Sequence, residues 1–488
     1  MDGTQEIVLK PGQQKAFRQL KDFIDTPNAR VFILCGYAGT GKTTLMRFLL
    51  AELNARQRPY RLLASTGRAA KILANLTGDK EGASTIHSMI YCFRGLNQDL
   101  SNIDTTKVEV SGQLILTFEP TTVDEERDKE GMVYIVDEAS MIADRTGGVI
   151  TQASFGSGRL LKELLDYDKR PQSKYLFVGD PCQLPPITEV FSPALYPNYF
   201  RQAFGIEAPM VQLTQIVRQG EHNDIIKVSQ HVRHCFDMAP PDKSAYRGMN
   251  YRDYLPFTNC SNIRLYPTRS LMLQQYVENI QQHGFNHSTL ICRSNKECFL
   301  QSNIVRSQLG IGGDIIVKGD LLMVVQNNVC GLMNGDMVEV VEVEGGTTSH
   351  AGLRFRKAVV KELFTQRKQL LLLLEDTLNS PMTNLSQAQQ KTLFVDFITR
   401  MKRRNITQKD QDRFNEAMRV DPYLNALRCN YGYVITCHKA QGGEWDDVFV
   451  DLPDSFMYQP TKGTYQWIYT AMTRARNTLH LVNGCNIR

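Results

Sequence analysis

Short apolar segments that end in polar turns recur in the first part of the chain. Residues 31–36 (VFILCG), 132–136 (MVYIV) and 174–178 (KYLFV) are apolar almost throughout, which is typical of strands buried on both faces of a parallel sheet. The turn after the first segment leads into LMRFLLAEL, which has helical spacing. Because the carboxyl ends of parallel strands meet at one edge of a sheet, we expect the polar turns to lie together. The pattern predicts an α/β protein.

Alternating polar and apolar residues predict two further elements. Residues 107–118 (KVEVSGQLILTF) read as a β-hairpin that turns at Ser111–Gly112. Three later segments resemble strands of a small antiparallel barrel, and they are MVEVVEVE (337–344), LRFRKAVVKEL (353–363) and KQLLLLLED (368–376). A helical stretch follows at 393–418, and its basic residues suit a solvated face as well as a face toward phosphate.

Composition narrows the class of protein. The chain has 488 residues, 42% hydrophobic and 22% charged, which is ordinary globular usage and enough for two to four domains. Apolar runs such as Leu370–Leu374 are far shorter than a membrane-spanning helix. The stretch MDGTQEIVLK lacks a secretory signal pattern, so we expect a cytoplasmic protein without a membrane partner. The 11 cysteines include no Cys-x-x-Cys pair, so neither a disulfide framework nor a zinc cluster is indicated. The net charge of +5 is too mild to identify a partner.

The stretch GYAGTGKTTL fits the phosphate-loop pattern G-x-x-x-x-G-K-[ST] between a predicted strand and a predicted helix. Its glycines let backbone N–H groups converge on phosphate oxygens, and the helix N-terminus favours negative charge. Lys42 is expected to reach the β- and γ-phosphates of ATP, and the Thr43 hydroxyl to hold Mg²⁺. The residues expected to bind nucleotide here are Gly36, Gly39, Thr40, Gly41, Lys42, Thr43 and Thr44.

Polar residues after the next two strands complete a site for hydrolysis. Asp137 ends the second strand and is expected to bind Mg²⁺, while Glu138 can activate the attacking water as a general base. Gln183 lies in the turn GDPCQLPPI, where three prolines restrict the backbone. We expect its amide to lie near the γ-phosphate. Because the turn is stiff, a small displacement of the amide should be transmitted to the rest of the turn and not absorbed by it.

From about residue 9 to residue 482 the chain resembles superfamily 1 helicases, most closely the RecD/Dda type. The motifs that carry the resemblance follow the family's order, and they are Leu9-x-x-x-Gln13-x-x-Ala16, GYAGTGKTT, VDEAS, GDPCQLPPI, LTQIVRQ (213–219), YVITCHKAQGGEW (433–445) and YTAMTRAR (469–476). The resemblance implies that Gln13 reads adenine, that Arg218 and Arg474 are arginine fingers, and that Glu444 lies near the ribose. It also implies that nucleic acid is bound by Thr66, Arg68, Thr85, His87, Asn295, Thr436, His438 and Lys439. Taken alone, His87 suits a structural role better than a binding role, and within this motif the two roles are balanced.

The same resemblance implies two RecA-like parallel-sheet domains, a β-hairpin pin, and an SH3-like barrel with a helical extension. We place the first RecA-like domain at 1–90 and 132–200 and the pin at 91–131. The second RecA-like domain is expected at 201–330 and 431–488, with the barrel and helices at 331–430.

The expected activity is ATP-driven movement along single-stranded DNA with unwinding of a duplex or fork, in the 5′→3′ direction that the family implies. We expect a monomer that works beside other replication or recombination proteins. Two alternatives stay open, the motor subunit of a recombination nuclease and an ATP-switched clamp without net unwinding. An RNA track also stays open, because backbone contacts of this type do not select clearly against a 2′-hydroxyl.

Overall fold

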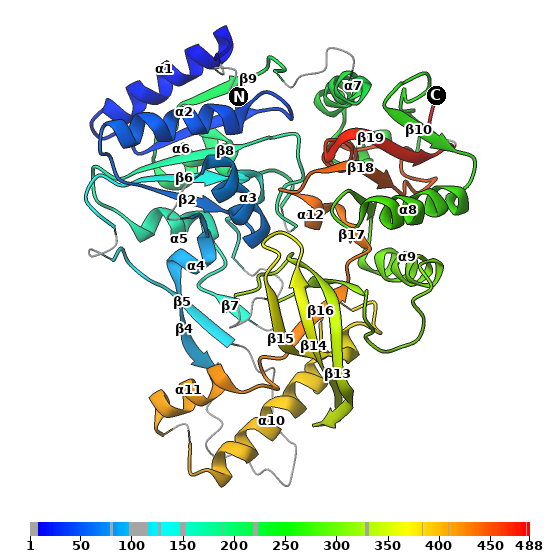
Figure 1. The fold of residues 1–488 in the computed structure, drawn as a ribbon. Coiled ribbons are helices and arrows are strands. Elements are labelled where there is room, and N and C mark those ends of the chain that lie inside the picture. The colour runs from blue at the N-terminus through cyan, green and yellow to red at the C-terminus, as the bar shows by residue number, and fades with distance from the viewer. Residues whose placement is uncertain are drawn as a thin grey trace, which may run out of the picture.

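A computed structural model describes residues 8–78, 82–96, 116–124, 128–146, 153–187, 189–217, 223–326, 331–382, 384–407, 409–484 and 486–488. Within this part of the chain, two parallel sheets lie beside each other, and a barrel with two helices lies across one end of both (Figure 1). None of the helices in the described ranges combines the length and apolarity that crossing a membrane requires.

The first sheet has six parallel strands in the order β3-β2-β6-β8-β1-β9. Its strands are β1 (Val31–Gly36), β2 (Tyr60–Ala64), β3 (Ser84–Thr85), β6 (Val133–Asp137), β8 (Lys174–Gly179) and β9 (Met210–Leu213). The helices around it are α1 (Pro11–Asp25), α2 (Lys42–Ala55), α3 (Gly67–Thr77), α4 (Ile86–Ile90), α5 (Leu160–Tyr167) and α6 (Pro197–Phe204). Successive residues of β1 enter opposite cores, with Ile33 toward α5 and Phe32 and Leu34 toward α1 and α2. This double burial explains the continuous apolar segments in the sequence.

The second sheet is also parallel, in the order β10-β19-β18-β11-β17. Its strands are β10 (Ile263–Tyr266), β11 (Ser288–Cys292), β17 (Val434–Thr436), β18 (Trp445–Val450) and β19 (Ala475–Val482). Its helices are α7 (Asp224–Met238), α8 (Arg269–His283), α9 (Asn295–Gln308), α12 (Cys437–Ala440) and α13 (Lys462–Met472). The chain thus leaves this sheet after α9 and returns to it at β17, and the barrel is built from the segment between them.

Five strands close the barrel: β12 (Leu321–Val324), β13 (Met337–His350), β14 (Leu353–Glu362), β15 (Lys368–Leu374) and β16 (Leu427–Tyr431). The sequence identified the middle three strands and missed the two that close it. The β15–β16 pair is parallel, and the other four pairs are antiparallel. Helices α10 (Gln387–Arg403) and α11 (Gln411–Val420) pack on one end of the barrel through a shared apolar cluster.

A small third sheet projects from the first domain toward these helices. It contains β4 (Tyr91–Leu96), β5 (Leu116–Pro120) and β7 (Ala153–Phe155), with β4 and β5 antiparallel. Phe93 of β4 packs against the cluster under α10 and α11, beside which β4 lies in Figure 1. The hairpin turn predicted at Ser111–Gly112 lies outside the described residues.

The two parallel sheets and the barrel confirm the predicted fold class. The predicted domain limits differ from the sheets in three places. Strand β7 pairs with β5, so the projecting sheet includes residues beyond 131. Strand β9 pairs with β1, so the first sheet extends beyond residue 200. The barrel begins with β12, before residue 331. Strands β9 and β12 have only four residues each, which is too short for a clear periodic pattern.

Candidate active site

The phosphate loop joins β1 to α2 at the carboxyl edge of the first sheet. Gly39 and Gly41 have φ of 76° and 80°, a region that favours glycine. A Cβ atom at Gly41 would lie 2.4 Å from Nε2 of Gln13, so the loop also needs glycine there for space. The Lys42 ammonium donates to the carbonyls of Gly36 at 2.6 Å and Tyr37 at 3.2 Å. The loop therefore curls around the lysine that the sequence assigned to the phosphates.

Gln13 ties α1 to this loop. Its Nε2 donates to the Thr40 carbonyl at 3.2 Å, and its Oε1 accepts from the backbone N–H of Lys10 at 3.0 Å. The Thr40 hydroxyl donates to the Tyr37 carbonyl at 2.8 Å. Both side chains thus stabilise the phosphate loop through its carbonyl groups. Reading of adenine by Gln13 stays a prediction.

Two carboxylates face the loop from the end of β6. Burial raises the pKa of Asp137 to about 7, helped by the neighbouring charge of Glu138 and opposed by Lys42. Glu138 has a left-handed backbone with φ of 50°, which is uncommon outside glycine and asparagine and turns the chain sharply. A pKa near 7 makes the charge of Asp137 depend on a neighbouring cation.

The donor set suits Mg²⁺. The Thr43 hydroxyl and the Asp137 carboxylate line the same cavity beside Lys42, and hard oxygen ligands of this kind, few in number, are what Mg²⁺ uses when substrate phosphates and waters complete its shell. Within the described ranges, no group of three or more His, Cys, Asp and Glu residues could hold a metal unaided.

Gln183 lies between the acid and an arginine from the other sheet. In the amide orientation that satisfies both neighbours, Nε2 donates to Oε2 of Glu138 at 3.2 Å and Oε1 accepts from Nη2 of Arg474 at 3.2 Å. Gln183 is 3% exposed and Arg474 is 4% exposed. The side chain in the stiff proline-rich turn therefore connects the two halves of the molecule.

Arg474 is held in place by its own domain. It follows α13, and its guanidinium donates to the carbonyls of Thr470 at 3.1 Å and Gly443 at 3.2 Å. These contacts fix the direction of the guanidinium before any nucleotide is involved. The second predicted finger, Arg218, lies outside the described residues.

Both domains line one cavity of about 820 Å³. The residues that the sequence assigned to ATP and that line it are Gly39, Gly41, Lys42, Thr43, Thr44, Asp137, Glu138, Gln183, Glu444 and Arg474. Glu444 pairs with Nε of Arg476 at 3.3 Å, and its place near the ribose stays a prediction. Because residues from separate sheets share the cavity, a triphosphate bound there would contact both domains.

Arg68 also lines this cavity, and its predicted role as a nucleic-acid contact stays a prediction. Its guanidinium lies 4.4 Å from the ring centroid of Trp445 in the second domain. Burial lowers its pKa to about 10, so it remains charged at neutral pH. The first turn of α3 places Arg68 beside the cavity that Lys42 and Arg474 also line, a position that the motif alone did not indicate.

The other predicted contacts in the first domain have local partners. Thr66 and Thr85 are helix N-caps, and their hydroxyls accept from the backbone N–H groups of Ala69 at 3.2 Å and Ser88 at 3.1 Å. The His87 ring lies 5.6 Å from Tyr91 and 5.1 Å from Phe155. Burial lowers the pKa of His87 to about 4, so it is neutral at pH 7 and offers no positive charge to phosphate.

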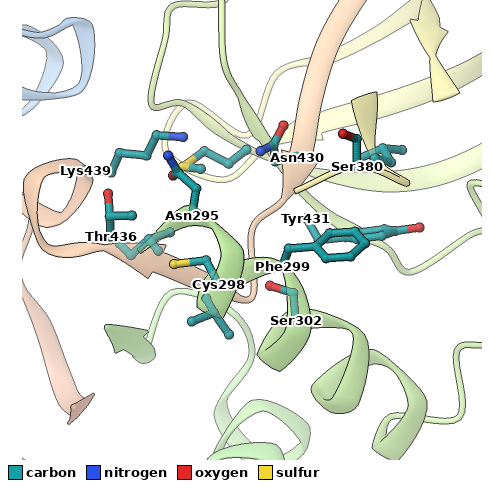
Figure 2. Close-up of a pocket in the computed structure, with 13 residues that line it drawn as sticks. Asn295, Cys298, Phe299, Ser302, Ser380, Asn430, Tyr431, Thr436 and Lys439 are labelled. Atoms are coloured by element: carbon teal, nitrogen blue, oxygen red, sulfur yellow. The ribbon is translucent and has the colours of Figure 1, made fainter. Parts of the chain in front are cut away.

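Three predicted contacts in the second domain surround one small cavity between α9, β17 and β16. Asn295, Thr436 and Lys439 all line it, and Figure 2 shows the side chains of Lys439 and Asn295 beside each other. Burial lowers the pKa values of Lys439 and of His438, which does not line the cavity. The structure thus brings together an ammonium, an amide and a hydroxyl, donors that suit a phosphate backbone.

Two family models match separate parts of the chain. A family model described as an AAA domain matches residues 8–237, and one described as a UvrD-like helicase C-terminal domain matches residues 431–482. An uncharacterized protein of Acanthamoeba polyphaga mimivirus is 23% identical over 96% of this chain and 98% of its own length.

Two helicases match shorter parts. The ATP-dependent RecD2 DNA helicase of Deinococcus radiodurans is 29% identical over 42% of this chain, and the ATP-dependent DNA helicase Pif1 of Bdellovibrio bacteriovorus is 33% identical over 38%. The matches span only 22% and 34% of those proteins. A solved structure of two coordinating Pif1 helicases that unwind forked DNA has a TM-score of 0.51 at 15% identity, over 97% of this chain and 92% of that one. This last likeness concerns the fold.

Proposed function

The chain is a superfamily 1 helicase of the RecD/Dda type, and from that premise we propose that it hydrolyses ATP to move 5′→3′ along single-stranded DNA and to separate duplex DNA. The observation that carries the proposal is the position of Gln183 between Glu138 and Arg474. An amide that contacts the general base and an arginine of the other domain can link hydrolysis to domain movement.

Five residues that line the cavity have roles in the proposed reaction. Lys42 binds the β- and γ-phosphates at the helix N-terminus, and Glu138 takes a proton from the attacking water. Arg474 stabilises the charge that develops on the transferred phosphoryl group. Mg²⁺, held by Thr43 and Asp137, would neutralise phosphate oxygens. The raised pKa of Asp137 fits this role, because a cation beside it favours the ionised form.

Movement follows from having the catalytic groups on two domains. Binding of ATP draws the lysine loop and the Arg474 segment together, and hydrolysis releases them. The second domain grips the strand through the cluster of Asn295, Thr436 and Lys439. In this proposal the duplex ahead of the motor meets the projecting sheet of β4, β5 and β7, and the contact of this sheet with the cluster under α10 and α11 supports that role. We propose that a monomer performs this cycle.

Strand displacement on two tailed duplexes tests the proposal. Purified protein with ATP and Mg²⁺ is expected to unwind the 5′-tailed duplex, and single-stranded DNA is expected to stimulate ATP turnover. Lys42→Ala protein serves as the control, since it should lose turnover while it still binds the strand. Unwinding of the 3′-tailed duplex alone would overturn the direction, and turnover that ignores DNA would favour a switched clamp.

A further inference from the structure

Helix α13 reaches across the domain boundary and contacts the phosphate loop directly. The hydroxyl of Tyr469 donates to Oδ2 of Asp180 at 2.7 Å and accepts from the backbone N–H of Ala38 at 2.9 Å. Tyr469 is 1% exposed and Asp180 is fully buried. One phenol from the second domain therefore joins the loop that binds phosphate to the turn that carries Gln183.

Two other side chains of α13 bind the backbone of the loop turn that carries Gln183. Gln466 donates to the carbonyls of Pro181 at 3.3 Å and Gln183 at 3.1 Å, and the hydroxyl of Thr470 accepts from the N–H of Leu184 at 3.0 Å. Three further hydrogen bonds thus join the backbone from Pro181 to Leu184 to α13. Arg474 follows the last turn of that helix.

The loop amide makes this arrangement sensitive to nucleotide. Backbone N–H groups of a phosphate loop converge on phosphate oxygens, but the N–H of Ala38 donates to Tyr469 instead. If nucleotide binding draws the N–H of Ala38 toward phosphate, this hydrogen bond to Tyr469 would lengthen or break. Asp180 holds the other end, because its second oxygen accepts from the N–H of Cys182 at 3.0 Å.

We propose that Tyr469 is a positioning residue whose hydroxyl transmits the state of the phosphate loop to α13, and so sets Arg474 against Gln183. This inference rests on the proposed ATPase function and names the group that couples the two domains. The phenol is not among the described residues that line the cavity shared by Lys42 and Arg474. It acts through the helix that carries the arginine.

Tyr469→Phe removes the hydroxyl and keeps the ring. Tyr465→Phe is the matched control, because Tyr465 lies one turn earlier on the same helix and donates to Asp253 within its own domain. The first measurement is amide exchange over residues 462–474 with and without a non-hydrolysed ATP analogue, in the absence of DNA. Wild-type and Tyr465→Phe proteins are expected to change exchange there on nucleotide binding, and Tyr469→Phe protein is expected to bind the analogue with an unchanged Kd and to lose that change.

Steady-state kinetics with single-stranded DNA give the second measurement. For Tyr469→Phe we expect kcat to fall about tenfold, roughly the effect of one hydrogen bond to a charged group, with the KM for ATP unchanged. Asp180→Asn keeps an acceptor for the phenol and should lose less activity. Equal behaviour of Tyr469→Phe and Tyr465→Phe in both measurements would overturn the inference, as would a rise in Kd for the analogue as large as the fall in kcat. If wild-type turnover ignores DNA, the proposed function fails, while the exchange measurement still decides the role of Tyr469.

Discussion

The guanidinium of Arg68 lies 4.4 Å above the ring of Trp445, and the two residues come from different domains. A Cβ atom at Gly443 would lie 2.6 Å from the Trp445 ring and 3.2 Å from the Arg68 guanidinium carbon. Glycine at 443 therefore lets the backbone approach the stack closely. The same Gly443 offers its carbonyl to Arg474, so the stack and the arginine finger share one support.

This stack predicts an optical signal for domain closure. Trp445 and Trp467 are the two tryptophans of the chain, so Trp467→Phe leaves Trp445 as the single emitter. Its emission is expected to change when an ATP analogue binds, and Arg68→Met should abolish the change because the cation over the ring is lost. In Arg68→Met protein the KM for ATP should rise about fivefold, equivalent to roughly 1 kcal/mol. If Arg68→Met instead leaves the KM for ATP unchanged and weakens binding of single-stranded DNA, Arg68 contacts nucleic acid, as the sequence predicts.

The bridge made by Gln183 predicts uncoupling. Gln183→Ala should bind nucleotide and DNA with ordinary affinity, because neither ligand depends on this amide for its charge contacts. Hydrolysis should no longer track movement, so more ATP is consumed for each base pair separated. The measurement is the ratio of phosphate released to duplex unwound. Gln183→Glu puts a second carboxylate beside Glu138, so its kcat should fall below that of Gln183→Ala. Normal coupling in Gln183→Ala would remove the relay role.

The burial of His87 predicts a dependence of stability on pH. Its pKa is lowered from 6.5 to about 4, so below pH 6.5 the unfolded chain binds a proton that the folded chain does not. Stability therefore falls as pH drops from 6.5 toward 4. At pH 5 the expected contribution is about 2 kcal/mol. Urea unfolding at pH 7 and pH 5 should show this loss in wild-type protein and a smaller loss in His87→Gln. Exposed His234 gives the control, because His234→Gln should keep the pH dependence of the wild type.

Much of the catalytic site could be predicted because its residues lie in contiguous motifs that end buried strands. Lys42, Asp137 and Gln183 each follow an apolar segment, and parallel pairing brings those ends to one edge. Tyr469 and Trp445 gave no such signal. Tyr469 lies in an apolar stretch where an aromatic residue suits the core, and Trp445 stands among glycine and acidic residues. Their contacts are with residues hundreds of positions away.

The strands of the barrel could be predicted only where polar and apolar residues alternate over many positions. Strands β13 and β14 have 14 and 10 residues, and their alternating pattern was clear. The closing strands β12 and β16 have 4 and 5 residues and meet across about a hundred intervening positions, so neither local pattern nor loop length indicated the pairing. The sequence pattern also gave no signal for the contact between the barrel and α3, because that contact depends on single charged side chains.

That contact gives the last prediction. Lys71 of α3 donates to Asp336 at 2.6 Å and to Glu362 at 2.5 Å, both in the barrel region. The two carboxylate side chains are 3% and 6% exposed. Burial alone would lower the pKa of Lys71, but its hydrogen bonds to the two carboxylates raise it overall. The ammonium therefore compensates two buried charges at once.

Lys71→Met should leave both carboxylates buried without their cation. We expect the free energy of unfolding to fall by about 3 kcal/mol, the usual cost of removing one partner from a buried ion pair. Adding Asp336→Asn should recover part of that loss, because it removes one of the two uncompensated charges. Urea unfolding followed by circular dichroism measures both changes. Arg201→Met, which breaks an ion pair on the exposed surface, should change stability little. If Lys71→Met were as stable as Arg201→Met, the barrel would have to be held to the first domain by its apolar contacts alone.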